Sequence, residues 1–338
     1  MIVAILPWIV LLQQLSYVTP AGFLSVGDWG SAALGGYHQQ NAMDTAAAMK
    51  VYIEKATAVH RNGQDPPLFV LSTGDNFYYC GIQNTSDPQI TEDYTALFDG
   101  MGIPWYQSLG NHDYGFSPEA QLALNETIPD WIMDGRYYHR RVVFTPSIIA
   151  NIIVLDTNPC IHDYRGDDRR RWDPCGTEYP DCSPIAEPCR FHENIIAQDC
   201  NSQLEWAKLT LDNITKSASS REWIFVVGHH KANEINVADF QTTILDDPRV
   251  HLYLNGHTHN LEHYEINGQA KYITTGAGGM VIIGDAVTTF TTATTKSIWS
   301  KVVTGFTSHT FINDGTTLRT EFWDVKNNES IYSFELDV

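Results

Sequence analysis

The chain has 338 residues, of which 43% are hydrophobic and 18% charged, so it can bury a large core and global disorder is disfavoured. Its formal net charge is −19, from 40 acidic and 21 basic side chains, and a field of that sign repels nucleic acids. An anionic ligand remains compatible with this charge where a local cation, such as a metal ion, reverses the field.

The first segment is an almost continuous apolar run, Ile2–Leu12, interrupted only by Pro7. It is too short to span a bilayer, and no apolar run in the chain reaches the roughly 18 residues that would, so no integral membrane segment is expected in the mature chain. The run is typical of a secretory signal peptide, although no basic segment precedes it. We predict a signal peptide over residues 1–21 and a single domain over residues 22–338. A buried first strand is the alternative for the run.

Six short apolar runs, each followed by polar or glycine-rich residues, predict buried strands. They are Phe23–Val26, Leu68–Leu71, Trp105–Leu109, Ile152–Leu155, Trp223–Val227 and His251–Leu254. Apolar residues at helical spacing predict helices over Ala42–Val59 and Gln203–Ile214, and a shorter one over Ala238–Leu245.

Strands alternate with helices early in the chain and a β-rich region follows, which predicts an α/β sandwich. The end of the chain is expected to form a hairpin, with strands over Leu318–Val325 and Ile331–Leu336. Residues 287–310 are rich in Thr with little polar contrast, and we expect irregular structure or a weak strand there.

Cysteine usage and sequons point to an oxidising compartment. The cysteines are Cys80, Cys160, Cys175, Cys182, Cys189 and Cys200. An even number after a signal-like start favours disulfides, whose pairing the sequence leaves open, and the absence of a C-x-x-C pair argues against zinc. Residues 158–201 therefore predict a disulfide-stapled surface insertion. Four N-x-S/T sequons suit a glycosylated surface: Asn84, Asn125, Asn213 and Asn328.

Polar side chains typical of metal sites directly follow the predicted strands. They are Asp28; Asp75, Asn76 and Tyr78; Asn111, His112 and Asp113; His229 and His230; and His257 and His259. Ligand sites of α/β sheets form at the carboxyl ends of strands, and carboxylates with imidazoles suit iron, zinc or manganese. Two such ions can clamp a phosphoryl group during displacement. Each block alone is weak evidence, but all five in one chain are informative.

The order Gly-Asp-x-Gly, Gly-Asp-Asn-x-Tyr, Gly-Asn-His-Asp, Gly-His-His and Gly-His-x-His resembles the calcineurin-like metallophosphoesterases. Among these it is most similar to the purple acid phosphatases, in particular the small tartrate-resistant type. The resemblance runs from about Phe23 to the end of the chain, with the Cys-rich insertion as the main departure. It implies an α/β fold with a central β-sandwich of two mixed sheets flanked by α-helices.

The resemblance also implies a binuclear centre and an activity. Family members hydrolyse phosphate monoesters at acid pH with a metal-bound hydroxide as nucleophile. Asp28, Tyr78 and His259 would bind Fe(III), and Asp75 would bridge both ions. Asn111, His229 and His257 would bind a divalent ion, which is Fe, Zn or Mn in relatives. His112 would contact the phosphate and assist the leaving group.

The same resemblance sets expectations for location and partners. We expect a secreted glycoprotein, or one kept in a lysosome- or vacuole-like compartment. Its substrates would be phosphorylated small molecules or phosphoproteins, with no nucleic acid partner, and a monomer is expected.

Tyr78 separates this subfamily from its cousins. Ser/Thr protein phosphatases and many phosphodiesterases place a His two residues after the first Asp, where this chain has Gly30. The first ion would then lack a ligand unless Tyr78 supplies one, and a phenolate is a hard donor that favours Fe(III). A packed aromatic residue is the alternative role for Tyr78.

The fourth motif departs from the family pattern. Relatives follow its first His with an aromatic residue and Pro, whereas here His229 precedes His230, Lys231 and Ala232. We expect His230 either to contact substrate or to replace the aromatic residue structurally. Relatives also carry a further substrate-facing His shortly downstream, and residues 233–240 contain none. The run Gly276–Gly279 is expected to provide close backbone packing.

Two other functions remain open from the sequence. One is a phosphodiesterase or nucleotide pyrophosphatase on the same metal core, which requires room for a second ester group. The other is a catalytically inactive scaffold, a path that tends to lose metal ligands. This chain keeps all seven.

Overall fold

The computed structural model describes residues 21–58, 68–166, 174–175, 189–217, 222–282 and 294–338. Residues 1–20 of the predicted signal peptide lie outside this part of the chain. In the described part, no helix combines the length and the apolar character needed to cross a bilayer.

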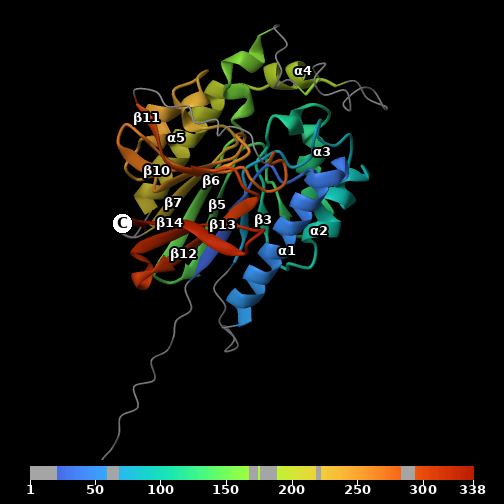
Figure 1. Ribbon diagram of the computed structural model, residues 1–338. Coiled ribbons are helices and arrows are strands. Elements are labelled where there is room, and N and C mark those ends of the chain that lie inside the picture. The colour runs from blue at the N-terminus through green and yellow to red at the C-terminus, as the bar shows by residue number, and fades with distance from the viewer. Residues whose placement is uncertain (1–20, 59–67, 167–173, 176–188, 218–221, 283–293) are drawn as a thin grey trace, which may run out of the picture.

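Among the residues described, two mixed sheets of seven strands each form the centre of the molecule, and a sandwich of two mixed sheets is the predicted architecture (Figure 1). In the first, the strand order is β14-β13-β12-β1-β2-β3-β4, and β1 to β4 run parallel. Its strands are β1 (Gly22–Val26), β2 (Val70–Ser72), β3 (Trp105–Tyr106), β4 (Trp131–Ile132), β12 (Gly305–Ile312), β13 (Thr317–Asp324) and β14 (Glu329–Asp337).

The second sheet has the order β11-β9-β10-β8-β7-β6-β5, with parallel pairing from β6 through β7 and β8 to β10. Its strands are β5 (Tyr138–Thr145), β6 (Ile148–Val154), β7 (Glu222–Val227), β8 (Leu252–Asn255), β9 (Leu261–Ile266), β10 (Gln269–Thr275) and β11 (Thr295–Lys301). The parallel strands of both sheets carry the predicted motifs at their carboxyl ends.

Helices cover the strands on two sides (Figure 1). They are α1 (Gly36–Ala58), α2 (Ala96–Phe98), α3 (Pro118–Ala123), α4 (Phe191–Ile196) and α5 (Cys200–Ser217). Helix α1 begins at Gly36, before the predicted Ala42. The residues that its first turns bury are the polar His38 and Asn41, so the apolar period that predicted the helix starts only at Ala42. The segment predicted as a short helix over Ala238–Leu245 contains a single π-helical turn, Gln241–Leu245.

Aromatic side chains fill the space between the sheets. The ring of Phe23 on β1 lies 5.0 Å from that of Phe225 on β7, and both are buried. A second cluster surrounds Trp29, whose ring contacts Phe98 at 5.3 Å and Trp105 at 5.7 Å. Each such buried ring contributes about 1.5–3 kcal/mol relative to exposure, so the loop after β1 is held on a rigid base.

For residues 287–310 we expected irregular structure or a weak strand, and from residue 294 on the described part forms strands β11 and β12. Strand β12 lies in the first sheet, paired with β1 and β13. Its polar residue His309 is buried and bonds to both neighbouring strands: Nε2 lies 2.9 Å from Ser25 Oγ on β1, and Nδ1 lies 3.0 Å from Thr320 Oγ1 on β13. A strand that satisfies its polar groups across the sheet shows no apolar period, which is why the sequence predicted it only weakly.

The Cys-rich segment is more than a surface insertion. Disulfides join Cys160 to Cys200 and Cys175 to Cys189, and Cys80 is also disulfide-bonded. Tyr164 and Phe191 of this segment are buried, with ring centroids 5.1 Å apart. The predicted staple is present, but the part of the segment that the structure describes packs into the domain, because these apolar side chains need a partner surface.

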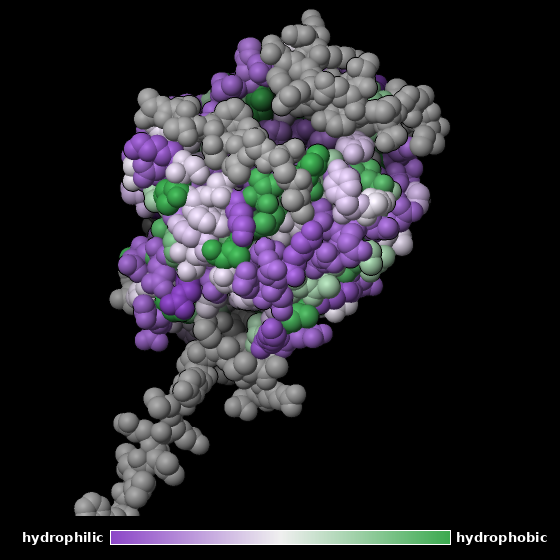
Figure 2. All heavy atoms as spheres, in the orientation of Figure 1, coloured by the Kyte–Doolittle hydropathy of each residue, from purple (hydrophilic) through white to green (hydrophobic). Residues whose placement is uncertain are grey.

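On the face shown in Figure 2, hydrophobic residues form separate spots among hydrophilic ones. This face therefore has no broad apolar surface among the residues described.

Candidate metal centre

The seven side chains predicted as ligands converge at the carboxyl ends of five strands. They are Asp28 after β1, Asp75 and Tyr78 after β2, Asn111 after β3, His229 after β7, and His257 and His259 after β8. Parallel strands from both sheets end at the same edge of the sandwich, so residues up to 231 positions apart in the chain meet there.

One half of the cluster is centred on the Tyr78 hydroxyl. Its Oη lies 3.0 Å from Asp28 Oδ1, 2.8 Å from Asp75 Oδ2 and 3.1 Å from His259 Nε2. Asp28 Oδ1 also lies 3.3 Å from His259 Nε2. Two carboxylates, a phenol and an imidazole thus face one point, an oxygen-rich donor set.

The other half is centred on the Asn111 side-chain oxygen. Asn111 Oδ1 lies 3.0 Å from His229 Nε2 and 3.1 Å from His257 Nδ1. His229 Nε2 lies 3.4 Å from Asp75 Oδ2. Asp75 therefore contacts both halves, and its one carboxylate is placed to be shared between two ions.

The backbone is bent where the side chains enter the cluster. Asp28, Asp75, His257 and His259 have positive φ values of 56°, 57°, 74° and 50°. Such values are uncommon outside Gly and cost of the order of 1 kcal/mol or more each. Their concentration in these motifs is typical of a site where surrounding structure enforces ligand geometry.

Glycines allow the backbone to close around the two carboxylates. A Cβ on Gly110 would lie 2.1 Å from Asp75 Oδ1, and one on Gly256 would lie 2.4 Å from Asp28 Oδ2. A Cβ on Gly276, in the run expected to provide close packing, would lie 2.7 Å from Asp28 Oδ2. These contacts leave no room for side chains, so the glycines are a packing requirement of the cluster.

Gly30 explains why Tyr78 is needed in the first half. A Cβ at position 30 would lie 1.8 Å from the backbone oxygen of Asn76. Position 30 therefore cannot carry a ligand side chain on this backbone. Its carbonyl instead accepts a hydrogen bond from the Tyr78 N–H at 2.8 Å, which fixes the residue that brings a phenol into the cluster.

Burial and neighbouring charges have opposite effects on the pKa values of Asp75 and His229, and the same effect on that of Tyr78. Burial raises the pKa of Asp75, but the charges of His229 and His112 outweigh it, so that pKa lies well below its usual value. Burial lowers the pKa of His229, and the charge of Asp75 reverses the effect and raises it to about 9. Burial and the charges of Asp28 and Asp75 raise the pKa of Tyr78 well above 10. A phenolate at this position therefore needs a cation beside it, and the donor set fits one.

His112, the predicted catalytic residue, lies against the shared carboxylate. Its backbone N–H donates to Asp75 Oδ1 at 2.9 Å, and its Nδ1 lies 2.6 Å from the Tyr79 carbonyl oxygen. Its ring is 4.4 Å from that of Tyr78. The imidazole is thus oriented by protein contacts at the edge of the cluster.

His230 is enclosed by protein. Its Nδ1 lies 2.8 Å from Thr157 Oγ1 and its Nε2 lies 2.9 Å from Tyr164 Oη. Both ring nitrogens bond to protein hydroxyl groups, which is the arrangement expected of a structural role. Direct substrate contact by His230 stays a prediction.

Two supporting residues were not assigned roles from the sequence. Asp113 accepts the backbone N–H groups of Asn76 and Gly110, at 3.0 and 2.7 Å, and so ties the second motif to the third. Thr157 follows β6, and this is the one predicted strand after which no metal-site residue was predicted. Because Thr157 comes directly after Asp156 at the end of that strand, its position in the sequence could have indicated a place near the site.

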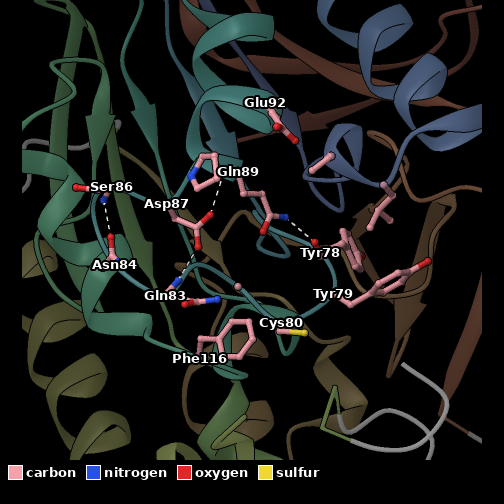
Figure 3. Close-up of a pocket in the computed structure, with 14 residues that line it drawn as sticks. Tyr78, Tyr79, Cys80, Gln83, Asn84, Ser86, Asp87, Gln89, Glu92 and Phe116 are labelled. Atoms are coloured by element: carbon pink, nitrogen blue, oxygen red, sulfur yellow. Dashed lines mark hydrogen bonds between the residues drawn. The ribbon is translucent and has the colours of Figure 1, made fainter. Parts of the chain in front are cut away.

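A cavity of about 460 Å³ adjoins the cluster through Tyr78 and Tyr79 (Figure 3). Gln89 reaches from the cavity wall to the Tyr78 carbonyl, with Nε2 2.5 Å from the oxygen. The wall also carries Asp87 and Glu92, and none of its described lining residues is Lys or Arg. The cavity is therefore an acidic space beside the candidate centre.

Comparisons with known proteins identify the family that the sequence matches. A family model described as calcineurin-like phosphoesterase matches residues 23–261. The chain is 29% identical to purple acid phosphatase 7 of Arabidopsis thaliana, over 76% of this chain and 69% of the relative. It is 28% identical to tartrate-resistant acid phosphatase type 5 of Mus musculus, over 81% and 77%, and 28% identical to that of Homo sapiens, over 78% and 74%.

Two solved structures share the fold. The chain superposes on GAP50, the anchor in the inner membrane complex of Plasmodium, with a TM-score of 0.66 and 23% identity, over 95% of this chain and 89% of that one. It superposes on purple acid phosphatase PPD1 from yellow lupin (Lupinus luteus) with a TM-score of 0.53 and 14% identity, over 94% of this chain and 54% of that one. At these identities the likeness shows the fold alone.

Proposed function

The chain belongs to the calcineurin-like phosphoesterase family, and we propose that it is an acid phosphatase that hydrolyses phosphate monoesters. The observation that carries this proposal is the shared position of Asp75, which contacts the Tyr78 half and the His229 half of one cluster. The similar curated proteins are purple and tartrate-resistant acid phosphatases, a family that implies a binuclear metal centre. The disulfides suit a secreted or lysosome/vacuole-like location.

In this proposal the donor set divides between two ions. Asp28, Tyr78 and His259 would hold Fe(III), for which a hard phenolate oxygen is a suitable donor. Asn111, His229 and His257 would hold a divalent Fe, Zn or Mn ion, and Asp75 would bridge the two. When bound, the ions would supply charge against the phosphate oxygens and lower the pKa of water, which makes hydroxide available as the nucleophile.

His112 is the protein group that would handle the leaving oxygen. Because its Nδ1–H donates to the Tyr79 carbonyl, the opposite nitrogen, Nε2, is the atom that would pass a proton to that oxygen. The hydrogen bond from the backbone N–H of His112 to Asp75 keeps His112 next to the shared carboxylate.

Metal quantification with a visible spectrum tests this proposal. We expect two ions per chain, at least one of them iron, and an absorption band from the phenolate-to-iron charge transfer. Tyr78→Phe should abolish the band, because it removes the oxygen and keeps the ring. The matched control is Tyr137→Phe. Its ring centroid lies 4.9 Å from that of Trp206, which is not a member of the cluster. A wild-type chain with one ion or none and no visible band would refute the binuclear centre.

The alternative functions are separated by turnover. Faster hydrolysis of an aryl phosphodiester than of the matching monoester would assign a phosphodiesterase or pyrophosphatase instead. No turnover on either substrate by the chain with both ions bound would assign an inactive scaffold.

The acidic cavity predicts a preference in the leaving group. A carboxylate and a unit charge about 4 Å apart in water interact with about 1 kcal/mol, and the energy falls off with distance. We expect kcat/KM for phosphoethanolamine to exceed that for phosphoglycolate roughly 10-fold at low salt, and Glu92→Gln to reduce this ratio. The matched control is Glu54→Gln on the exposed face of α1. Equal kcat/KM values for the two substrates would contradict the prediction.

A further inference from the structure

A buried chain of hydroxyl, imidazole and hydroxyl groups lies behind the candidate metal centre. It consists of Thr157, His230 and Tyr164, whose exposed fractions are 2%, 1% and 4%. His230 Nδ1 lies 2.8 Å from Thr157 Oγ1 and its Nε2 lies 2.9 Å from Tyr164 Oη. The proposed reaction uses none of the three. Burying polar groups costs free energy unless they are hydrogen-bonded, and these three satisfy one another.

The protons of this chain can be assigned from its geometry. Thr157 Oγ1 accepts the backbone N–H groups of His229 and His230, each at 3.2 Å, which occupies both of its lone pairs. Its own hydrogen is then donated to His230 Nδ1. The neutral His230 ring therefore carries its proton on Nε2 and donates it to Tyr164 Oη. Each hydrogen bond in the trio therefore has a defined donor and a defined acceptor.

The hydrogen-bonded trio of Thr157, His230 and Tyr164 contacts two of the proposed ligands of the divalent ion. Thr157 holds the backbone of His229, and the His230 ring lies 4.9 Å from the His229 ring. The His230 ring is also 4.5 Å from that of His257. A third contact comes from the same segment: Asn158 Nδ2 donates to the Leu109 carbonyl at 2.9 Å, just before the third ligand, Asn111.

The Cys-rich segment holds Tyr164, the residue at one end of this hydrogen-bonded trio, in place. The disulfide from Cys160 to Cys200 fastens the turn before Tyr164 to α5. The Arg165 guanidinium next to it donates to the carbonyls of Pro159 and Gln198, each at 3.1 Å. Tyr164 therefore has a fixed position from which its hydroxyl can hold His230.

We propose that Thr157, His230 and Tyr164 form an outer support that positions the ligands of the divalent ion, and that Tyr164 links the Cys-rich segment to this support. The proposal rests on the binuclear centre of the proposed function and gives the Cys-rich segment a role in it. Tyr164 is a positioning residue that acts on the ion through His230. Removal of an outer partner of a metal site reduces metal affinity about 10–100-fold.

The test is Tyr164→Phe, which keeps the ring that packs on Phe191 and removes the hydroxyl. The chain is prepared with iron bound and its divalent ion removed, and the Kd for Zn²⁺ is measured by competition with a chromophoric chelator. We expect the Kd to rise about 10-fold or more, with an unchanged visible band. Activity lost at limiting Zn²⁺ should return at saturating Zn²⁺, because the catalytic groups are intact.

Thr157 supplies a second, independent pair of variants. Thr157→Val removes the hydroxyl at nearly constant volume and should raise the Zn²⁺ Kd by a similar factor. Thr157→Ser keeps the oxygen and should stay close to wild type, a rescue that loss of packing would not show. The control for Tyr164→Phe is Tyr137→Phe, with thermal unfolding recorded for every variant.

The outcomes separate the two proposals. If wild-type chain binds no pair of ions, the proposed function falls and the support has nothing to position. If the wild type binds two ions and the Zn²⁺ Kd of folded Tyr164→Phe and Thr157→Val equals that of wild type, the proposed function stands and this inference is overturned. If Tyr164→Phe fails to fold, Thr157→Val compared with Thr157→Ser decides alone.

Discussion

Asp75→Asn should remove one or both ions and reduce turnover of an aryl phosphate at pH 5 by more than about 100-fold, the upper end of the effect of losing an outer partner. Asn has nearly the same shape, but it has no negative charge and only one oxygen donor. That oxygen cannot both accept the His112 N–H and serve two ions, as the Asp75 carboxylate is placed to do. The loss should be visible in metal content per folded chain as well as in rate.

Asp163→Asn is the control for this substitution. Its carboxylate is half-exposed and lies 3.7 Å from His162 Nδ1, which is not a member of the cluster. The control should keep two ions and wild-type turnover. If Asp75→Asn also retained both ions and more than about a tenth of wild-type turnover, the shared-carboxylate arrangement would be wrong, and the hydrolase proposal would lose its main support.

Gly30→Ala should destabilise the folded chain by about 3 kcal/mol or more, at the upper end of the cost of overpacking. The added Cβ would meet the Asn76 oxygen at 1.8 Å and the Phe77 nitrogen at 2.6 Å. Both are backbone atoms, so the chain between Asp75 and Tyr78 must move. We therefore expect a lower Tm by several degrees, together with loss of the visible band.

Gly135→Ala is the matched control, since its added Cβ would come no closer than 3.4 Å to a neighbour. Its free energy of unfolding should match that of wild type within about 1 kcal/mol, and its visible band should be unchanged. The measurements are thermal unfolding by circular dichroism and iron content. A Gly30→Ala variant whose Tm lies within a degree of the wild-type Tm, and whose visible band is intact, would contradict this prediction. It would show that the loop adjusts to the added Cβ and that ligand placement does not depend on this glycine.

Local sequence patterns were enough to predict the strands that carry the motifs. The runs ending at Val26 and Val227 are strongly apolar, bounded by Gly, and buried on both faces in a parallel arrangement, so their signal does not depend on distant residues. The C-terminal hairpin was predicted from two β-type runs on either side of the Asn327–Asn328 turn, and it is confirmed as the antiparallel pair β13 and β14. Strand β12 was predicted only as a weak strand or irregular structure, because its polar side chains bond to other strands and leave no apolar period.

The sequence alone determined which donors this protein has and at which strand ends they stand. Asp28, Asp75 and His257 follow apolar runs, and parallel strands bring their carboxyl ends to one edge, so local hydrophobic pattern was sufficient to expect a single cluster. The fold class followed from the same pattern together with the family resemblance, and the two mixed sheets confirm it.

Only the tertiary structure decided how these donors are supported. The disulfide pairing, the burial of Tyr164 and the place of His230 between two hydroxyl groups involve residues dozens of positions apart in the chain. No local period records such contacts, because hydrogen bonds and close packing between distant segments depend on where the whole chain places them. The choice of Gly at position 30 became intelligible in the same way, once the Asn76 carbonyl was found against it.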